Sequence, residues 1–183
     1  MPHTEIMRNL LKLSAIVLAA MLGIVTIVVS ERILEHRRVK PAERVAPAGS
    51  LLPRAPLVNL QTNHDDYQNV TRGKVLLVFV TTDCDACRKE LSNVSQVVSS
   101  LASKVAVYGV GIEDRDSVRT FIESNHVAFP ILLDHGAVIL SHLGFRLMPT
   151  KVLLQDGVIT KIWYGSSPDK TALIKDVGEV EVK

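Results

Sequence analysis

This chain of 183 residues has few cysteines and a small net charge. Two cysteines are too few for the disulfide framework of a small secreted domain or for the four-thiolate set of a structural zinc or iron–sulfur site. The formal net charge is +2, and residues 46–183 carry 14 basic against 15 acidic side chains, so bulk electrostatics do not favour nucleic-acid binding. With 47% hydrophobic and 22% charged residues, the composition indicates one globular domain with an appendage.

Charge is absent altogether from residues 13–30, a run of 18 residues. A helix of this length can cross the hydrocarbon core of a membrane. A cleaved signal peptide ending at Val28-x-Ser30 is the alternative, although the run exceeds the usual apolar region of roughly 7–15 residues. We therefore predict a cytoplasmic tail at residues 1–12 and a single transmembrane anchor at residues 13–30.

The charges that flank this span favour a cytoplasmic domain, whereas we expect the domain on the extracytoplasmic side. Arg8 and Lys12 precede the span, but five basic residues follow it: Arg32, Arg37, Arg38, Lys40 and Arg44. The positive-inside rule would keep that second flank in the cytoplasm, although such a cluster can also bind anionic headgroups. Residues 39–56 hold four prolines, so we expect a linker at 31–54 that precedes a domain at 55–183.

The body of the chain alternates predicted strands and helices, which indicates an α/β fold. Val75–Thr81 is a continuous apolar run typical of a buried parallel strand, and residues 85–101 carry one apolar helical face. An Asp156-Gly157 turn predicts a closing hairpin, and Ser167 with Pro168 predicts the start of a last helix at 167–177. The remaining predicted elements are strands at 105–112 and 130–133, helices at 114–124 and 138–143, and hairpin strands at 152–154 and 158–162.

Both cysteines fall in one motif, Cys84-Asp85-Ala86-Cys87, between the buried strand and the start of the helix. The partial positive charge of a helix N-terminus stabilises a thiolate there, so Cys84 is the predicted nucleophile. Cys87 lies one turn further in, where it can attack a mixed disulfide on Cys84, and is the predicted resolving thiol. Asp85 adds a negative charge that opposes thiolate formation and favours a reductant over a strong oxidant.

Other uses of the two cysteines are less consistent with the sequence. Haem attachment needs a histidine directly after the motif, where this chain has Arg88. A metal site would need a further ligand from His126, His135 or His142, which are isolated in the sequence. We therefore predict no metal and no other cofactor.

The cysteine motif occurs together with two other patterns: Gly73–Phe79 (GKVLLVF) before it and Met148-Pro149-Thr150 before a later strand. In this combination the chain resembles the membrane-anchored TlpA/ResA-like thioredoxins over about residues 50–177. Between Cys87 and Pro149 lie 61 residues, enough for an extra helix and strand beyond a minimal thioredoxin domain. The resemblance implies a three-layer thioredoxin-like fold.

The resemblance also implies roles for residues outside the motif. It implies that Pro149 is cis and faces the dithiol, and that Met148 and Thr150 help to bind an extended substrate segment. From the residues alone, a trans proline that ends a loop is the alternative. Glu90 would assist proton movement at the site. The alternative for Glu90 is a solvated helix carboxylate near Arg88 or Lys89.

Two departures from the family pattern concern the surroundings of Cys84. The residue before it is Asp83 where relatives have an aromatic residue, and Ala86 replaces a frequent proline. Because Asp83 and Asp85 flank Cys84 with two carboxylates, we expect the pKa of its thiol to exceed the value that the helix dipole alone would give.

The function that these observations indicate is thiol–disulfide exchange by a membrane-anchored enzyme that reduces disulfides of extracytoplasmic proteins. Cytochrome c maturation is one task that the family performs. The expected partners are a protein disulfide or dithiol substrate, a membrane electron donor and membrane lipid around the anchor, without nucleic acid. A copper metallochaperone and a thioredoxin-like accessory protein of amine oxidation are the alternatives.

Overall fold

The structure is a computed structural model that describes residues 21, 46–101 and 104–178. Most of the predicted anchor at 13–30 and of the predicted linker at 31–54 lies outside the described residues. Among the residues that are described, no helix is both long and apolar enough to cross a membrane.

A single six-stranded sheet forms the middle layer, in the order β1-β4-β3-β2-β5-β6. β2 pairs in parallel with β3, and β3 with β4, whereas β1, β5 and β6 join their neighbours antiparallel. The strands span Val58–Asn59 (β1), Lys74–Val80 (β2), Ala106–Gly111 (β3), Ile131–Leu133 (β4), Thr150–Gln155 (β5) and Val158–Tyr164 (β6).

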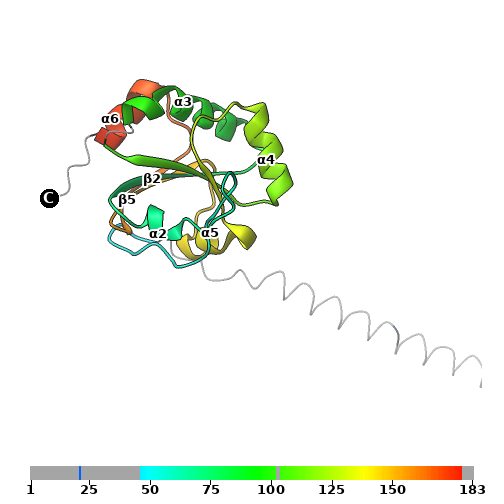
Figure 1. The fold of residues 1–183 in the computed structure, drawn as a ribbon. Helices are drawn as coiled ribbons and strands as arrows, with labels where there is room; N and C mark the ends of the chain where they lie inside the picture. The colour runs from blue at the N-terminus through cyan, green and yellow to red at the C-terminus, as the bar shows by residue number, and fades with distance from the viewer. Residues whose placement is uncertain (1–20, 22–45, 102–103, 179–183) are drawn as a thin grey trace, which may run out of the picture. The chain divides into compact units, whose positions relative to one another are not determined.

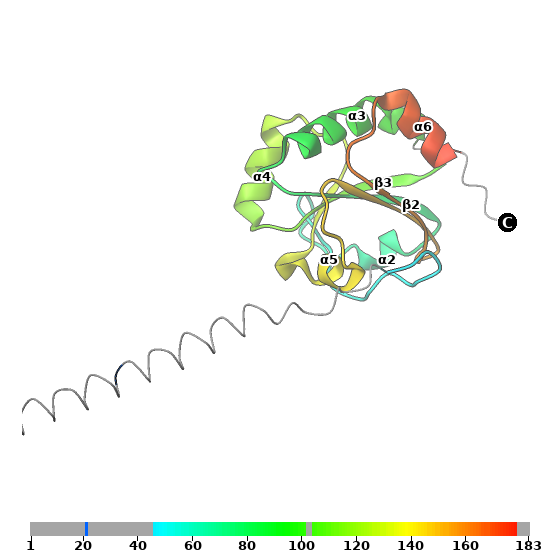
Figure 2. The same ribbon diagram turned by 180° about the vertical axis from the view of Figure 1, so that it is seen from behind.

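Helices cover both faces of the sheet, which confirms the predicted three-layer arrangement (Figures 1 and 2). One face carries α3 (Asp85–Leu101), α4 (Arg115–Ser124) and α6 (Lys170–Gly178). The other carries α2 (Tyr67–Val70) and α5 (Val138–Leu143), the latter preceded by a 3-10 turn at His135–Ala137.

The central strand β2 explains why the sheet needs two helical layers. Its residues are apolar on both sides: Leu76, Val78 and Val80 enter the core under α3, and alternate residues enter the opposite core. Complete burial of one such side chain contributes roughly 1.5–3 kcal/mol, so both faces must be covered.

The register between β2 and β5 brings two distant segments of the chain together. Phe79 pairs with Thr150 in this antiparallel ladder. The end of β2, which leads into the cysteine motif, therefore lies beside the start of β5, which follows Pro149. The hairpin from β5 to β6 turns at Asp156 and Gly157, whose φ angles of 51° and 78° are the positive values predicted for this turn.

The last helix begins later than the sequence predicts. α6 starts at Lys170, and the side chain of Asp169 accepts a hydrogen bond from the Ala172 N–H at 2.9 Å. The prediction that Ser167 caps this helix is therefore wrong, because Ser167 turns into the protein instead and is buried.

Residues ahead of the sheet also pack against it. Leu52 is buried, and its N–H donates to the carbonyl oxygen of Gly157 at 2.8 Å. The Gly49 N–H donates to the carbonyl oxygen of Ile159 at 2.7 Å. Residues 46–54, which the sequence placed in the linker, thus contact the hairpin of the domain.

Candidate active site

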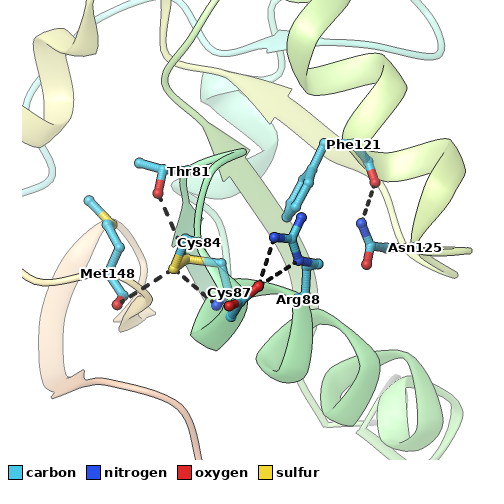
Figure 3. A network of polar contacts seen from close by, with 8 residues as sticks. Thr81, Cys84, Cys87, Arg88, Phe121, Asn125 and Met148 are labelled. Atoms are coloured by element: carbon cyan, nitrogen blue, oxygen red, sulfur yellow. Dashed lines mark hydrogen bonds and ion pairs between the residues drawn. A yellow bond between two sulfur atoms is a disulfide. The ribbon is translucent and has the colours of Figure 1, made fainter.

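The two cysteines are joined by a disulfide across the first turn of α3, with their Cα atoms 5.2 Å apart (Figure 3). They differ in exposure: Cys87 is fully buried beneath the helix, whereas Cys84 is partly exposed. β2 places the pair, since the strand ends at Val80 and the helix begins at Asp85. A reagent that approaches from solvent therefore meets Cys84 before Cys87.

The start of the helix supplies hydrogen-bond donors to Cys84. The N–H of Cys87 donates to Cys84 Sγ at 3.1 Å, and the Arg88 N–H donates to the Cys84 carbonyl oxygen at 3.1 Å. The donors at a helix N-terminus carry partial positive charge, which would stabilise a thiolate on Cys84 in the reduced protein. The Thr81 hydroxyl lies 4.0 Å from Cys87 Sγ, on the buried side of the pair.

The Met148–Pro149 peptide bond is cis and lies beside the disulfide, with the Met148 carbonyl oxygen 3.9 Å from Cys84 Sγ (Figure 3). The Gly165 N–H donates to the Pro149 carbonyl oxygen at 2.8 Å and holds the loop. Thr150 is fully buried, and its hydroxyl donates to the carbonyl oxygen of Leu147. Its side chain therefore stabilises the loop from within.

Tyr164 is the last residue of β6 and lies beside the start of β5. Tyr164 on β6 pairs in register with Thr150, and its ring packs edge-on against Phe145 at 6.1 Å between centroids. Desolvation raises the pKa of the Tyr164 hydroxyl above its usual 10.0.

The two acidic residues that flank Cys84 are both exposed. Asp85 accepts hydrogen bonds from Arg88, with Nη2 at 2.7 Å from Oδ1. The Arg88 guanidinium also lies 5.9 Å from the centre of the Phe121 ring on α4. The positive charge of Arg88 thus offsets part of the negative charge that the sequence places beside Cys84.

Glu90 is the site residue whose surroundings differ most from expectation. It is fully buried, so the alternative of a solvated helix carboxylate near Arg88 or Lys89 is wrong. Its Oε1 accepts a hydrogen bond from Lys151 Nζ at 2.8 Å and another from the Ser167 hydroxyl at 3.0 Å. Its Oε2 accepts one from the Ser167 N–H.

Reasoning from the sequence missed Lys151 and Ser167, but one signal for Glu90 was present. Cys87, Glu90, Leu91 and Val94 follow helical spacing, so Glu90 lies in the buried stripe of α3. A carboxylate in such a stripe requires a partner of opposite charge or several hydrogen bonds.

Glu113 was also missed, and it supports the loop in front of the cysteine motif. Its Oε1 accepts a hydrogen bond from the Thr82 N–H at 3.0 Å. Within the described part of the chain, its buried Oε2 has no hydrogen-bond partner. Beside this loop, a cavity of about 520 Å³ is lined by residues of the motif region and of α4: Thr82, Arg88, Asp116, Ser117, Thr120, Phe121, Ser124 and Asn125.

Sequence comparison shows which known proteins the chain is similar to. The model of the redoxin family matches residues 42–180. The thioredoxin-like protein YneN of Bacillus subtilis is 29% identical over 126 residues, which cover 67% of this chain and 74% of that protein. The thiol-disulfide oxidoreductase ResA of Halalkalibacterium halodurans is 23% identical over 129 residues, which cover 69% and 73%.

Solved structures give the same fold. StoA from Bacillus subtilis superimposes with a TM-score of 0.59 at 24% sequence identity, over 73% of this chain and all of that one. The fold is therefore the α/β thioredoxin-like fold that the sequence predicted. The chain belongs to the redoxin family, and it is a thiol–disulfide oxidoreductase whose Cys-x-x-Cys pair is Cys84 and Cys87.

Proposed function

We propose that the protein is a dithiol reductant that transfers two electrons from Cys84 and Cys87 to a disulfide of an extracytoplasmic protein. The observation that carries the proposal is the unequal exposure of the two cysteines beside the cis-proline loop. Cys84 is partly exposed and lies near the Met148 carbonyl oxygen, whereas Cys87 is fully buried.

The reaction follows from this asymmetry. The Cys84 thiolate attacks one sulfur of the substrate disulfide, and the other substrate sulfur leaves as a thiolate that takes up a proton. An extended substrate segment pairs with the backbone of Met148 and is thereby held against Cys84. Cys87, once deprotonated, then attacks Cys84 Sγ in the mixed disulfide, releases the second substrate thiol and closes the Cys84–Cys87 disulfide.

The acidic flank supports the reductive direction. Asp83 and Asp85 disfavour a thiolate on Cys84, and a less stable thiolate makes the reduced form a better electron donor. Arg88 compensates part of this effect through its ion pair with Asp85. We expect a reduction potential nearer to about −270 mV than to about −120 mV, and a value at the oxidising end would contradict the reductive role.

The membrane anchor at residues 13–30 and an extracytoplasmic domain also belong to this proposal. The uncharged run and the resemblance to membrane-anchored thioredoxins support them, and the basic flank after residue 30 opposes the orientation. A membrane electron donor would then re-reduce the pair. Labelling of reduced Cys84 in intact cells with an impermeant maleimide tests the orientation. If the reduced and accessible thiol is labelled only after lysis, the domain lies inside.

The exchange mechanism itself is tested by comparing the two single-cysteine variants. Cys84→Ser should abolish exchange, whereas Cys87→Ser should accumulate a mixed disulfide with its substrate because the resolving thiol is missing. Non-reducing gels of cell extracts, followed by identification of the protein held on Cys84, provide the measurement. A copper carrier would behave differently: both variants would lose bound copper to a similar extent, and neither would trap a partner.

A further inference from the structure

Lys151 is the second residue of β5 and lies two residues after the cis-proline. Its side chain is 3% exposed. Its ammonium group donates three hydrogen bonds, to Glu90 Oε1 at 2.8 Å, to the Gly165 carbonyl oxygen at 3.0 Å and to Ser167 Oγ at 3.0 Å. An ammonium group has three N–H donors, so all of them are used inside the protein.

The three acceptors come from different parts of the site. Glu90 lies on α3, one turn beyond Cys87, whereas Gly165 and Ser167 lie in the loop between β6 and α6. The same loop donates the Gly165 N–H to the Pro149 carbonyl oxygen. Lys151 therefore connects the cysteine helix to the segment that holds the cis-proline.

Stability alone does not account for this ion pair. Removing two charges from water is costly, and an apolar pair of similar volume is often as stable or more stable. What the pair does provide is fixed geometry, because charge-assisted hydrogen bonds hold three segments at set distances.

We propose that Lys151 is a positioning residue of the exchange reaction, whose link to Glu90 sets the cis-proline loop at the correct distance from Cys84 to receive a peptide substrate. The inference rests on the proposed roles of Cys84 and Met148. It differs from a proton-transfer role for Glu90, since the carboxylate serves here as an anchor for the ammonium group.

Two disulfide probes separate docking of a peptide from reactivity of the thiol. The first is an extended peptide whose single cysteine forms a mixed disulfide with thionitrobenzoate, and the second is 5,5′-dithiobis(2-nitrobenzoate), which has no peptide backbone. In both cases reduced Cys84 displaces thionitrobenzoate, which is coloured, and forms a mixed disulfide with the remaining half of the probe. The reduced protein should react faster with the peptide probe.

The test variant is the double substitution Glu90→Gln/Lys151→Met, which removes one charge of each sign and leaves the amide able to bond with Ser167. We expect the rate with the peptide probe to fall by about 10- to 100-fold, and the rate with the small probe to stay within about twofold. The pH profile of the small-probe reaction should not move. Lys161→Met is the matched control on β6, since Lys161 lies over the Trp163 ring, and it should leave both rates unchanged.

The outcomes distinguish the inference from the proposed function. Equal loss of both rates, or a shifted pH profile, would show that the pair acts on the thiol and would overturn the inference alone. No peptide preference in the native protein would overturn docking at Met148, and the inference with it. Ser167→Ala is the milder variant that keeps the test decisive should the double variant not fold, and it should lower only the peptide rate.

Discussion

Helix α3 carries two ion pairs that are alike in distance and opposite in burial. Arg88 and Asp85 are 2.7 Å apart, with side chains 45% and 97% exposed, whereas Lys151 and Glu90 are 2.8 Å apart and 3% and 0% exposed. An exposed pair contributes about 0–1 kcal/mol to stability, but removing one member of a buried pair costs about 3–5 kcal/mol.

This difference in burial indicates that the two sides of α3 have different roles. The exposed pair lies beside Cys84, where it changes the local charge and where dissolved salt screens it. The buried pair lies one turn further along and joins the helix to the rest of the site. The two pairs have nearly the same N–O distance. Their burial is therefore the reason that we expect their removal to have different effects on stability.

The largest expected effect is that of Lys151→Met, which leaves Glu90 buried without its cation. We expect the free energy of unfolding to fall by about 3–5 kcal/mol, measured by urea denaturation. Glu90→Gln in the same chain should restore most of the loss, because no uncompensated charge remains. A double variant as unstable as the single one would mean that the charges do not carry the effect.

Ser167→Ala should have a smaller effect on the same network. The substitution removes one hydrogen bond to Glu90 and one acceptor for Lys151, while the backbone N–H of residue 167 still reaches the carboxylate. A loss of about 1–3 kcal/mol is expected in the same denaturation experiment. Ser166→Ala, at the neighbouring position, is the control, and an equal loss there would point to the loop backbone rather than to the hydroxyl.

Arg88→Met breaks the exposed pair and should cost at most about 1 kcal/mol of stability. Its more specific effect concerns Cys84, because the negative charge of Asp85 is no longer offset. Alkylation of Cys84 by iodoacetamide at neutral pH should become slower, most clearly at low ionic strength. A rate that does not change with salt in either protein would contradict an electrostatic role for this pair.

The smallest effect is expected at Asp156, an exposed carboxylate that accepts hydrogen bonds from neutral groups. The Gln155 side chain and the Gly73 N–H donate to it, and both lower the pKa of Asp156 below its usual 3.8. A carboxylate with a lowered pKa stabilises the fold above pH 3.8, and this contribution is lost as the pH falls through the lower folded value.

Asp156→Asn should therefore melt at a slightly lower temperature than the native protein at pH 7, and the difference should disappear well below pH 3.8. Asparagine tolerates the positive φ at this position, so backbone strain does not enter the comparison. A difference in melting temperature that is constant with pH would show that the charge is not responsible.

Much of the fold could be predicted because the apolar pattern is regular. The spacing of Leu91, Val94 and Leu101 gave the bounds of α3, and the unbroken run after Gly73 gave β2. β1 and α2 have two and four residues, too few for a period to be recognised.

The site was predictable only where its residues are neighbours in the sequence. The cysteine pair follows from one motif, and the cis-proline loop from a resemblance. Ser167 illustrates the limit: a Ser-Pro pair locally favours a helix start, but a carboxylate 77 residues away binds both its hydroxyl and its N–H. Lys151 likewise looks like an ordinary strand residue until its partner is known.

The pairing of Phe79 with Thr150 also bears on how the length of the chain can vary among relatives. The cysteine motif follows β2 and the cis-proline precedes β5, so this pair of strands sets the positions of both. Insertions in the surface connections between α3 and the cis-proline can lengthen the protein without altering the spacing of the two halves of the site. One residue added within β2 or β5 would instead displace one half by about 3.3 Å and turn its side chains to the other face. This chain could therefore accept insertions in these connections while keeping the same reaction geometry.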